Sequence, residues 1–207
     1  MKTTVYIDGF NLYYGALRGT SYKWLDPMAL CRVMIPTNQV TKIKYFTARV
    51  SPRPSDPDQP NRQNIYLRAL RTIPGLEIYF GHFLSHVVSM PLANPGPGQS
   101  PFVKVIKTEE KGSDVNLATQ LLVDAWSGAF DCAVIISGDS DLKSPVQVTM
   151  DRFHKAVGIL NPQKIECKEL HAIARFYKHI RPSAIQSSQF PAMLTDGIGN
   201  FNKPPSW

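Results

Sequence analysis

The chain has 207 residues, enough for one domain with a complete hydrophobic core and a short appendage. Hydrophobic residues make up 43% of the sequence and charged residues 19%, which excludes a disordered or fibrous chain. No run approaches the roughly 20 apolar residues of a membrane span, and no signal-peptide pattern opens the sequence. Cys31, Cys132 and Cys167 are odd in number and lack C-x-x-C spacing, so we expect free thiols in a reducing cytoplasm.

The chain is basic, but its acidic residues hold the clearest functional signal. Lys and Arg number 23 against 16 Asp and Glu, which gives a net charge of +7 and favours a polyanionic partner. Four aspartates lie in or beside strand-turn signals: Asp8, Asp114, Asp139 and Asp141. An acidic pocket on a basic body suits a metal-dependent enzyme that acts on phosphates.

Strand and helix signals alternate through the first half of the chain. The pattern predicts a strand over 3–7, a helix over 12–17, a second helix over 28–34 that starts with Asp26 as N-cap and Pro27, and a strand over 40–50. Four prolines make 51–60 a loop. An amphipathic helix with a basic side over 61–73 and one β-rich stretch over 76–88 follow.

The second half continues the alternation after a Pro- and Gly-rich loop over 90–101. We expect a strand over 102–107, a helix over 114–126 with Ser113 as N-cap, a fully buried strand over 132–136, a helix over about 142–153, a strand over 156–160 and a last helix over 167–180. Strands alternating with helices predict a three-layer α/β domain with a mainly parallel central sheet.

Residues 1–180 therefore form the predicted domain, and 181–207 a C-terminal extension. Its composition is polar, with Gly and Pro, yet Phe190, Phe201 and Trp207 are apolar anchors. We expect these side chains to pack the extension onto the domain. A contact with a second copy of the chain, and hence a homo-oligomer, is left open.

The acidic residues are expected to meet at one edge of the sheet. Ligands of open α/β sheets bind outside the carboxyl ends of the strands, where strand order reverses. Asp8 follows the first strand, Asp139 and Asp141 follow the buried strand, and Asp114 opens the clearest helix. Because unpaired carboxylates repel one another, a divalent cation would stabilise this cluster, and oxygen ligands favour Mg²⁺ or Mn²⁺.

Three neighbouring residues have supporting roles in this hypothesis. Asn11 and Ser137 lie beside the acids and could orient a carboxylate or a water, while Lys111 could neutralise a phosphate. Each aspartate alone has a simpler explanation as a turn residue, a helix cap or a partner of a helix dipole. The four together favour a site, because independent caps have no reason to share one edge. Asp124, inside the helix, is left between a solvent-facing acid and a supporting role.

Three separated motifs resemble a known family. They are Tyr6–Tyr14 (YIDGFNLYY), Glu110–Ala118 (EKGSDVNLA) and Ile136–Leu142 (ISGDSDL), and in this order they resemble an NYN domain of the LabA-like group of PIN-like ribonucleases. The resemblance covers about 1–180. It implies a PIN-like α/β/α fold, metal-dependent RNA cleavage, metal ligands at Asp8, Asp114, Asp139 and Asp141, and supporting roles for Asn11 and Ser137. Many members carry another acid where this chain has Gln120, whereas here Asp124 lies one turn later.

Basic and aromatic residues predict where RNA would lie. Arg49, Arg62 and Arg68 cluster around the second strand and the helix that follows it, and we predict substrate-binding roles for them. A solvated basic face is the simpler alternative. Near Asp8, one of Phe10, Tyr13 and Tyr14 could stack on a base.

The leading hypothesis is a cytoplasmic Mg²⁺- or Mn²⁺-dependent ribonuclease that uses a carboxylate-bound metal and an activated water. Its rival is a catalytically silent NYN module that binds RNA or protein. Cleavage of DNA or another phosphodiester would use the same site.

Overall fold

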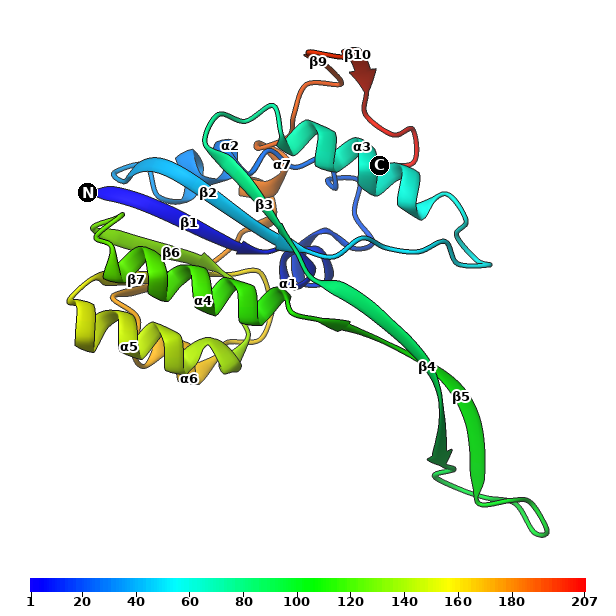
Figure 1. Ribbon diagram of the computed structural model, residues 1–207. Helices are drawn as coiled ribbons and strands as arrows, with labels where there is room; N and C mark the ends of the chain where they lie inside the picture. Colours follow the sequence, from blue (N-terminus) through cyan, green and yellow to red (C-terminus); the bar gives the residue numbers. More distant parts are fainter.

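The computed structural model describes residues 1–207 and places a six-stranded sheet at the centre of the molecule (Figure 1). Every neighbouring pair of strands is parallel, in the order β3-β2-β1-β6-β7-β8. The strands are β1 (Lys2–Asp8), β2 (Gln39–Thr47), β3 (Leu76–Phe80), β6 (Cys132–Ile136), β7 (Ala156–Asn161) and β8 (Phe176–His179). The prediction of a three-layer α/β fold with a mainly parallel sheet is confirmed.

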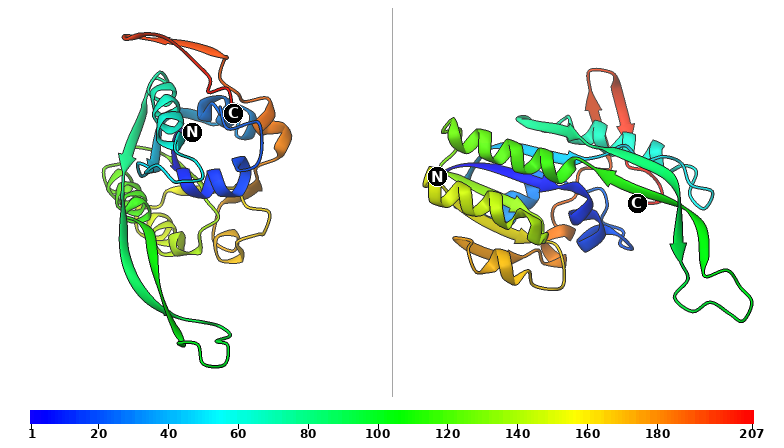
Figure 2. Two further views of the ribbon diagram at one scale, coloured as in Figure 1. Left: turned by 90° about the vertical axis from the view of Figure 1, so that its right-hand side faces the viewer. Right: turned by 60° about the horizontal axis from the view of Figure 1, so that its bottom comes forward.

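Helices cover both faces of this sheet (Figure 2). One face carries α4 (Ser113–Trp126), α5 (Lys143–Phe153) and α6 (Lys168–His171). The other carries α1 (Gly9–Leu12), the π-helical turn η1 (Tyr13–Leu17), α2 (Pro27–Met34), α3 (Gln59–Leu70) and α7 (Pro182–Gln186). Asp26 caps α2 as predicted, since its carboxylate accepts hydrogen bonds from the amides of Met28 and Ala29.

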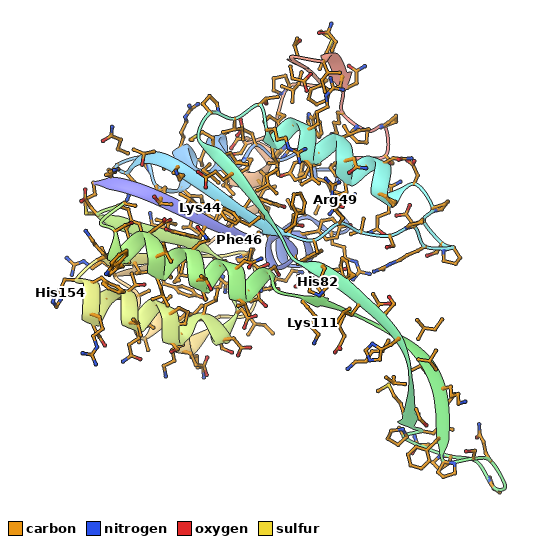
Figure 3. The ribbon with its side chains drawn as sticks, in the orientation of Figure 1. Lys44, Phe46, Arg49, His82, Lys111 and His154 are labelled. Carbon is orange, nitrogen blue, oxygen red and sulfur yellow. The ribbon has the colours of Figure 1, made fainter.

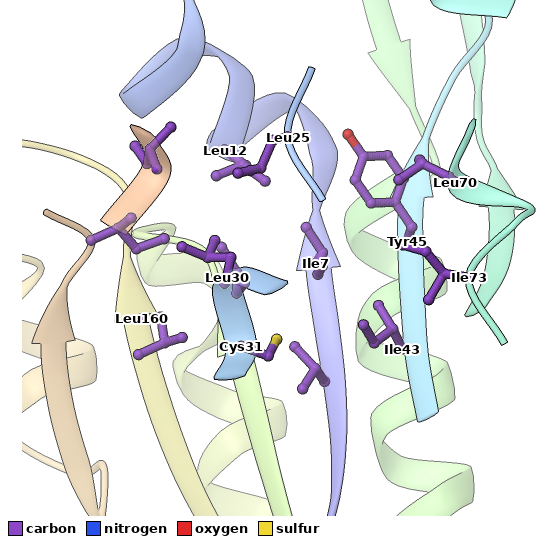
Figure 4. Packing of buried hydrophobic residues seen from close by; sticks show 14 of the residues in the cluster. Ile7, Leu12, Leu25, Leu30, Cys31, Ile43, Tyr45, Leu70, Ile73 and Leu160 are labelled. Carbon is purple, nitrogen blue, oxygen red and sulfur yellow. The ribbon is translucent and has the colours of Figure 1, made fainter. Parts of the chain in front are cut away.

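Alternation along the strands sends neighbouring side chains into two cores. In β1, Val5 and Ile7 pack with α2 and α3, whereas Tyr6 packs with α4 on the opposite face. Figure 4 shows the first of these cores, where Ile7 and Ile43 of the sheet lie near Leu30 and Leu70 of the helices. Because β1 and β6 are buried on both faces, the centre of the sheet is a rigid support for the residues that follow its strands.

The β-rich stretch predicted over 76–88 is two strands rather than one. It divides at Gly81 into β3 and β4 (His82–Pro91), and β4 pairs with β5 (Phe102–Lys111) in an antiparallel arm that projects from the body (Figures 1 and 2). A Cβ at position 81 would lie 2.3 Å from Glu110 Oε1 and 2.5 Å from the Lys111 carbonyl, so the crossing of the strands requires glycine. The loop predicted over 90–101 is the tip of this arm, and the arm exposes large apolar side chains such as Val87 and Ile106.

Three further predictions were wrong in detail. Helix α4 has Gly112 as its N-cap, with φ +96°, and Ser113 instead donates its hydroxyl to Glu110. The last helix predicted over 167–180 is the short α6 followed by β8, because Phe176 and Tyr177 alternate into opposite cores as edge-strand residues. The strand predicted over 40–50 ends at Thr47.

The C-terminal extension packs on the domain around Trp24. This indole is fully buried, donates a hydrogen bond to the Pro191 carbonyl at 2.8 Å, and has the rings of Phe190 and Phe201 within 6.5 Å. The extension forms α7 and a hairpin of β9 (Met193–Asp196) and β10 (Gly199–Asn202). None of the helices in the structure is long and apolar enough to cross a membrane.

We expect Phe190→Ala to lower the free energy of unfolding by about 3 to 4 kcal/mol, because it opens a cavity beside Trp24. Met193→Ala in the same extension is the control, since Met193 is 57% exposed and its loss should change stability by less than about 0.5 kcal/mol. Urea unfolding of both variants measures the difference. Equal, small effects would contradict the integration of the extension into the core.

Candidate functional site

The candidate site lies where the strand order of the sheet reverses. The chain runs from β1 outward through β2 to β3, then returns to the other side of β1 and continues through β6, β7 and β8. Ile7 pairs with Ile136, so Asp8 and Ser137 leave adjacent parallel strands at the same level. This is the position at which open α/β sheets bind their ligands, as the sequence predicts.

Asp8 is buried and held by two hydrogen bonds. It is 4% exposed, its Oδ1 accepts from the Asn11 amide at 2.9 Å, and its Oδ2 accepts from the Ser137 hydroxyl at 3.1 Å. The first bond makes Asp8 the N-cap of α1, so Asp8 has a local structural role as well as its place in the candidate site. The second bond fixes the carboxylate toward β6 as well.

The side chain of Asn11 joins three strand ends. Its Oδ1 accepts from the Gly138 amide and from Gln163 Nε2, both at 3.0 Å. The Gln163 amide in turn donates to Asn161 Oδ1 at the end of β7. Asn11 therefore positions the loops after β1, β6 and β7, while its role in orienting a carboxylate or a water stays a prediction.

Asp139 and Asp114 approach Asp8 from two other elements. Asp139 precedes the 3₁₀ turn η2 (Ser140–Leu142), donates its amide to Ser137 Oγ at 3.1 Å, and accepts the Asp141 amide at 2.9 Å. Asp114 stands in the first turn of α4. Asp141 is exposed, and its negative charge contributes to raising the pKa of Asp114.

Most of these residues line one open pocket, which we call the acidic pocket, whereas Ser137 and the predicted metal ligand Asp141 are not among its lining residues. Its walls include Asp8, Asn11, Glu110, Asp114, Asp139 and Gln163. The structure holds no cluster of three or more His, Cys, Asp or Glu side chains arranged as a ready-made metal cage. The carboxylates share a pocket without converging on one point, and no Lys or Arg side chain lines it.

The electrostatics of the acidic pocket are those of uncompensated negative charge. Burial raises the pKa of Asp8 to about 7, and the charges of Asp114 and Asp139 add to the shift, while the bonds from Asn11 and Ser137 oppose it. Desolvation raises the pKa of Asp114 too, together with the charges of Asp139, Glu110 and Asp141. A divalent cation would remove this repulsion.

The predicted substrate-binding residues are dispersed. Lys111 and Arg49 lie near the root of the arm (Figure 3), where Lys111 contacts Glu109 at 3.5 Å and Arg49 stacks over the Phe80 ring at 4.9 Å. Arg62 is tied to Asp56 at 2.6 Å. None of the three is in the acidic pocket.

Arg68 has a structural partner. Its guanidinium binds Asp196 with two contacts of 2.7 Å, donates to the Gly199 carbonyl and lies over the Phe201 ring. These contacts use the guanidinium to hold the C-terminal hairpin, and the substrate-binding role of Arg68 stays a prediction.

Asp124 is neither of the things that the sequence left open. It lies ten residues after Asp114 on α4, where its carboxylate forms an ion pair with the buried Lys44 at 2.6 Å and accepts a hydrogen bond from Tyr6. Gln120 accepts from the same lysine at 2.8 Å. The departure from the family pattern at these two positions thus concerns a buried polar network away from the acidic pocket.

Sequence reasoning missed Glu110 and Gln163. Glu110 accepts hydrogen bonds from the Ser113 amide and hydroxyl, and its charge acts on Asp114. Glu110 lies near the end of β5, four residues before Asp114 in the second motif, and this acidic neighbour could have been predicted as part of the site. Gln163 follows the carboxyl end of β7, and the rule that placed Asp139 would have found it.

Comparison with known proteins identifies the family. The NYN domain family matches residues 2–180. The chain belongs to the NYN domain family. The sequence-based resemblance to an NYN domain is therefore confirmed at the level of the family, and the acidic pocket lies within the matched residues.

Two individual proteins are similar to this NYN protein. 6-Hydroxy-3-succinoylpyridine 3-monooxygenase HspA of Pseudomonas putida is 30% identical over 236 residues, an alignment that covers 100% of this chain and 75% of the relative. The crystal structure of a protein of unknown function from Vibrio parahaemolyticus has a TM-score of 0.58 and 19% identity, with 91% of this chain and 96% of that chain covered. The second likeness supports the fold alone.

We expect Asp8→Asn to raise the free energy of unfolding at pH 8 in EDTA by up to about 4 kcal/mol, because the buried charge is removed and the oxygen that caps α1 is kept. The folded pKa of about 7 exceeds the ordinary value of 3.8, so the native state loses stability as pH rises between these values. The gain should therefore shrink toward pH 4. Urea unfolding at both pH values checks this, and a variant that is less stable at pH 8 would contradict it.

Proposed function

We propose that this NYN protein is a metal-dependent ribonuclease of the LabA-like, PIN-like type. The observation that carries the proposal is the meeting of Asp8, Asp114 and Asp139 in one pocket at the strand-order reversal, with the pKa values of two of them raised by burial and mutual repulsion. Selection for stability alone would not favour three acids with no cation among them. A divalent cation and a phosphate are the pair of ligands that such a pocket accommodates.

The donor set suits Mg²⁺ or Mn²⁺. Asp8, Asp114 and Asp139 would hold the cation, with Asp141 and Glu110 within reach through water, and every donor is an oxygen. When bound, the cation would supply a Lewis acid for the phosphate and lower the pKa of a water.

The remaining residues of the pocket prepare the acids for this role. Ser137 and the Asn11 amide hold the two oxygens of Asp8 in fixed directions. Asn11 Oδ1 locks the loops that carry Asp139 and Gln163. This arrangement avoids the need to orient the carboxylates when substrate binds. The Ser113 and Ser137 hydroxyls donate to Glu110 and Asp8 from buried positions, so we assign the attack on the phosphate to water.

RNA is the proposed substrate because the chain has a net charge of +7 and two basic residues lie at the root of the arm, outside the acidic pocket. Lys111 and Arg49 at the root of the arm could contact the phosphates that flank the reacting one. Such contacts position a polyanion and read no sequence.

Oxygenation of a small aromatic acid is a second candidate. It is favoured by the likeness to the Pseudomonas putida monooxygenase, which covers the whole of this chain and 75% of that protein, and by an aromatic-lined pocket that adjoins the acidic pocket. We rank it second on donor chemistry. Iron sites that activate oxygen typically use two histidines and one carboxylate, and no histidine lines the acidic pocket.

The ribonuclease proposal predicts Mg²⁺- or Mn²⁺-dependent cleavage of labelled single-stranded and hairpin RNA that EDTA abolishes. Asp139→Asn should lower the cleavage rate at least about a hundredfold, because it removes a charged oxygen from the pocket, while RNA affinity in a filter-binding assay is largely kept. Asp151→Asn is the matched control, since Asp151 is an exposed aspartate of α5 outside the pocket.

The pattern across the three proteins decides the proposal. Cleavage by wild type and Asp151→Asn, but not by Asp139→Asn, supports it. Equal cleavage by all three would indicate a contaminating nuclease, and binding without cleavage under any metal would favour a silent binding module.

The second candidate predicts oxygen consumption with 6-hydroxy-3-succinoylpyridine when a reduced nicotinamide cofactor is supplied. The ribonuclease proposal predicts no consumption above the rate of a protein-free control. An oxygen electrode measures it, and turnover that Asp139→Asn leaves intact would place that reaction outside the acidic pocket.

A further inference from the structure

A second pocket, which we call the aromatic pocket, lies directly beside the acidic pocket. Phe10, Tyr14 and Phe83 line both, so the two spaces share a wall. Tyr66 and Trp207 close the aromatic pocket on the side of α3 and the C-terminal extension. The loop over 51–60, which the sequence predicts, also contributes to its rim.

Two hydroxyl groups that line the aromatic pocket have no hydrogen-bond partner in the protein. Tyr45 is 6% exposed and Thr47 is 4% exposed, both line the pocket, and neither side chain makes a hydrogen bond. Figure 4 shows the Tyr45 hydroxyl pointing away from Ile43 and Ile73 in the core. Neighbouring Tyr66, in contrast, donates its hydroxyl to the Leu25 carbonyl at 2.9 Å. Because no protein group uses these two hydroxyls, both are available to hydrogen-bond a ligand that enters the aromatic pocket.

The pairing of β1 with β2 also brings a residue of the aromatic pocket close to Asp8. Tyr45 pairs with Ile7, the residue before Asp8, and the charge of Asp8 contributes to raising the pKa of the Tyr45 hydroxyl after the larger effect of burial. A ligand that filled the aromatic pocket would therefore continue into the acidic one.

The outer rim of the aromatic pocket carries positive charge. Arg53 lines it and forms no ion pair, whereas Arg62 beside it is tied to Asp56. Lys23 lies on the same rim. A flat ring with polar edges and an attached anion matches this combination of aromatic walls, unpaired hydroxyls and an available guanidinium.

We propose that the aromatic pocket binds one unpaired nucleotide of the RNA, adjacent to the phosphate in the acidic pocket. Its base lies between the aromatic walls, its edge bonds to the Tyr45 and Thr47 hydroxyls, and its outer phosphate meets Arg53. The inference rests on the proposed ribonuclease function and names its substrate class: single-stranded RNA, since a paired base must first leave its helix to enter.

Binding of a labelled single-stranded RNA of roughly ten nucleotides tests the proposal by fluorescence anisotropy. All proteins carry Asp139→Asn so that the RNA stays intact. The double change Tyr45→Phe and Thr47→Val removes both hydroxyls and keeps the walls, and should weaken binding about tenfold. Its stability in urea should not fall, because the hydroxyls contribute no bond to the fold. Tyr22→Phe, which removes a hydroxyl outside the pocket, should bind like its parent.

Two further arms identify the occupant. Replacing one nucleotide by an abasic one should weaken binding to the parent protein and have little effect on the double variant, and a duplex of the same sequence should bind more weakly than the single strand. Equal RNA affinities for parent and double variant would overturn the proposal. Saturable binding of nicotinate that only the double variant loses, with RNA binding unchanged, would overturn it in favour of a free aromatic acid. These experiments measure affinity and not cleavage. A failure to cleave RNA would therefore contradict the ribonuclease proposal, while the affinities would still show whether the aromatic pocket binds a nucleotide.

Discussion

The reversal of strand order at β1 is the constraint on which the site depends. It leaves an opening between the ends of β1 and β6, and the residues that follow both strands enter that opening. Gly9 makes the turn after β1 sharp enough, since a Cβ there would lie 2.7 Å from both the Phe46 carbonyl and the Tyr45 ring. Asp8 is thus held against β2 on one side and bonded to Ser137 after β6 on the other. The position of the acidic pocket follows from topology, and its rigidity follows from the buried strands beneath it.

Two aspartates with little exposure, Asp124 and Asp8, have opposite electrostatic surroundings. Asp124 is neutralised by Lys44, Gln120 and Tyr6, so its charge is satisfied within the protein. Asp8 has only neutral donors, and its nearest charged neighbours are acids that raise its pKa. The first arrangement stabilises the fold. The second lowers its stability at neutral pH unless a cation is present, which is the energetic pattern of a binding site kept for function.

Local patterns were enough to predict the layers of the fold, the cap at Asp26 and the meeting of Asp8, Asp114 and Asp139, because strand ends and helix starts are marked in the sequence. They did not predict the division at Gly81, which depends on how closely Glu110 approaches from a distant strand. They also did not predict the ion pair of Arg68, whose partner Asp196 is 128 residues away. Glu110 and Gln163 were not predicted, because they join the acidic pocket only when segments that are distant in the sequence come together in the fold. The aromatic pocket likewise combines α1, β2, a loop and the last residue, which no local window contains.

A crystal structure grown with Mn²⁺ and measured for anomalous scattering tests the central claim most directly, because it locates the cation without relying on activity. The account predicts an anomalous peak in the acidic pocket, about 2 Å from carboxylate oxygens of Asp8, Asp114 or Asp139. The same crystals of Asp8→Asn/Asp139→Asn protein should lack that peak. An empty acidic pocket at millimolar Mn²⁺, with peaks only at surface acids such as Asp56 and Asp58, would contradict it.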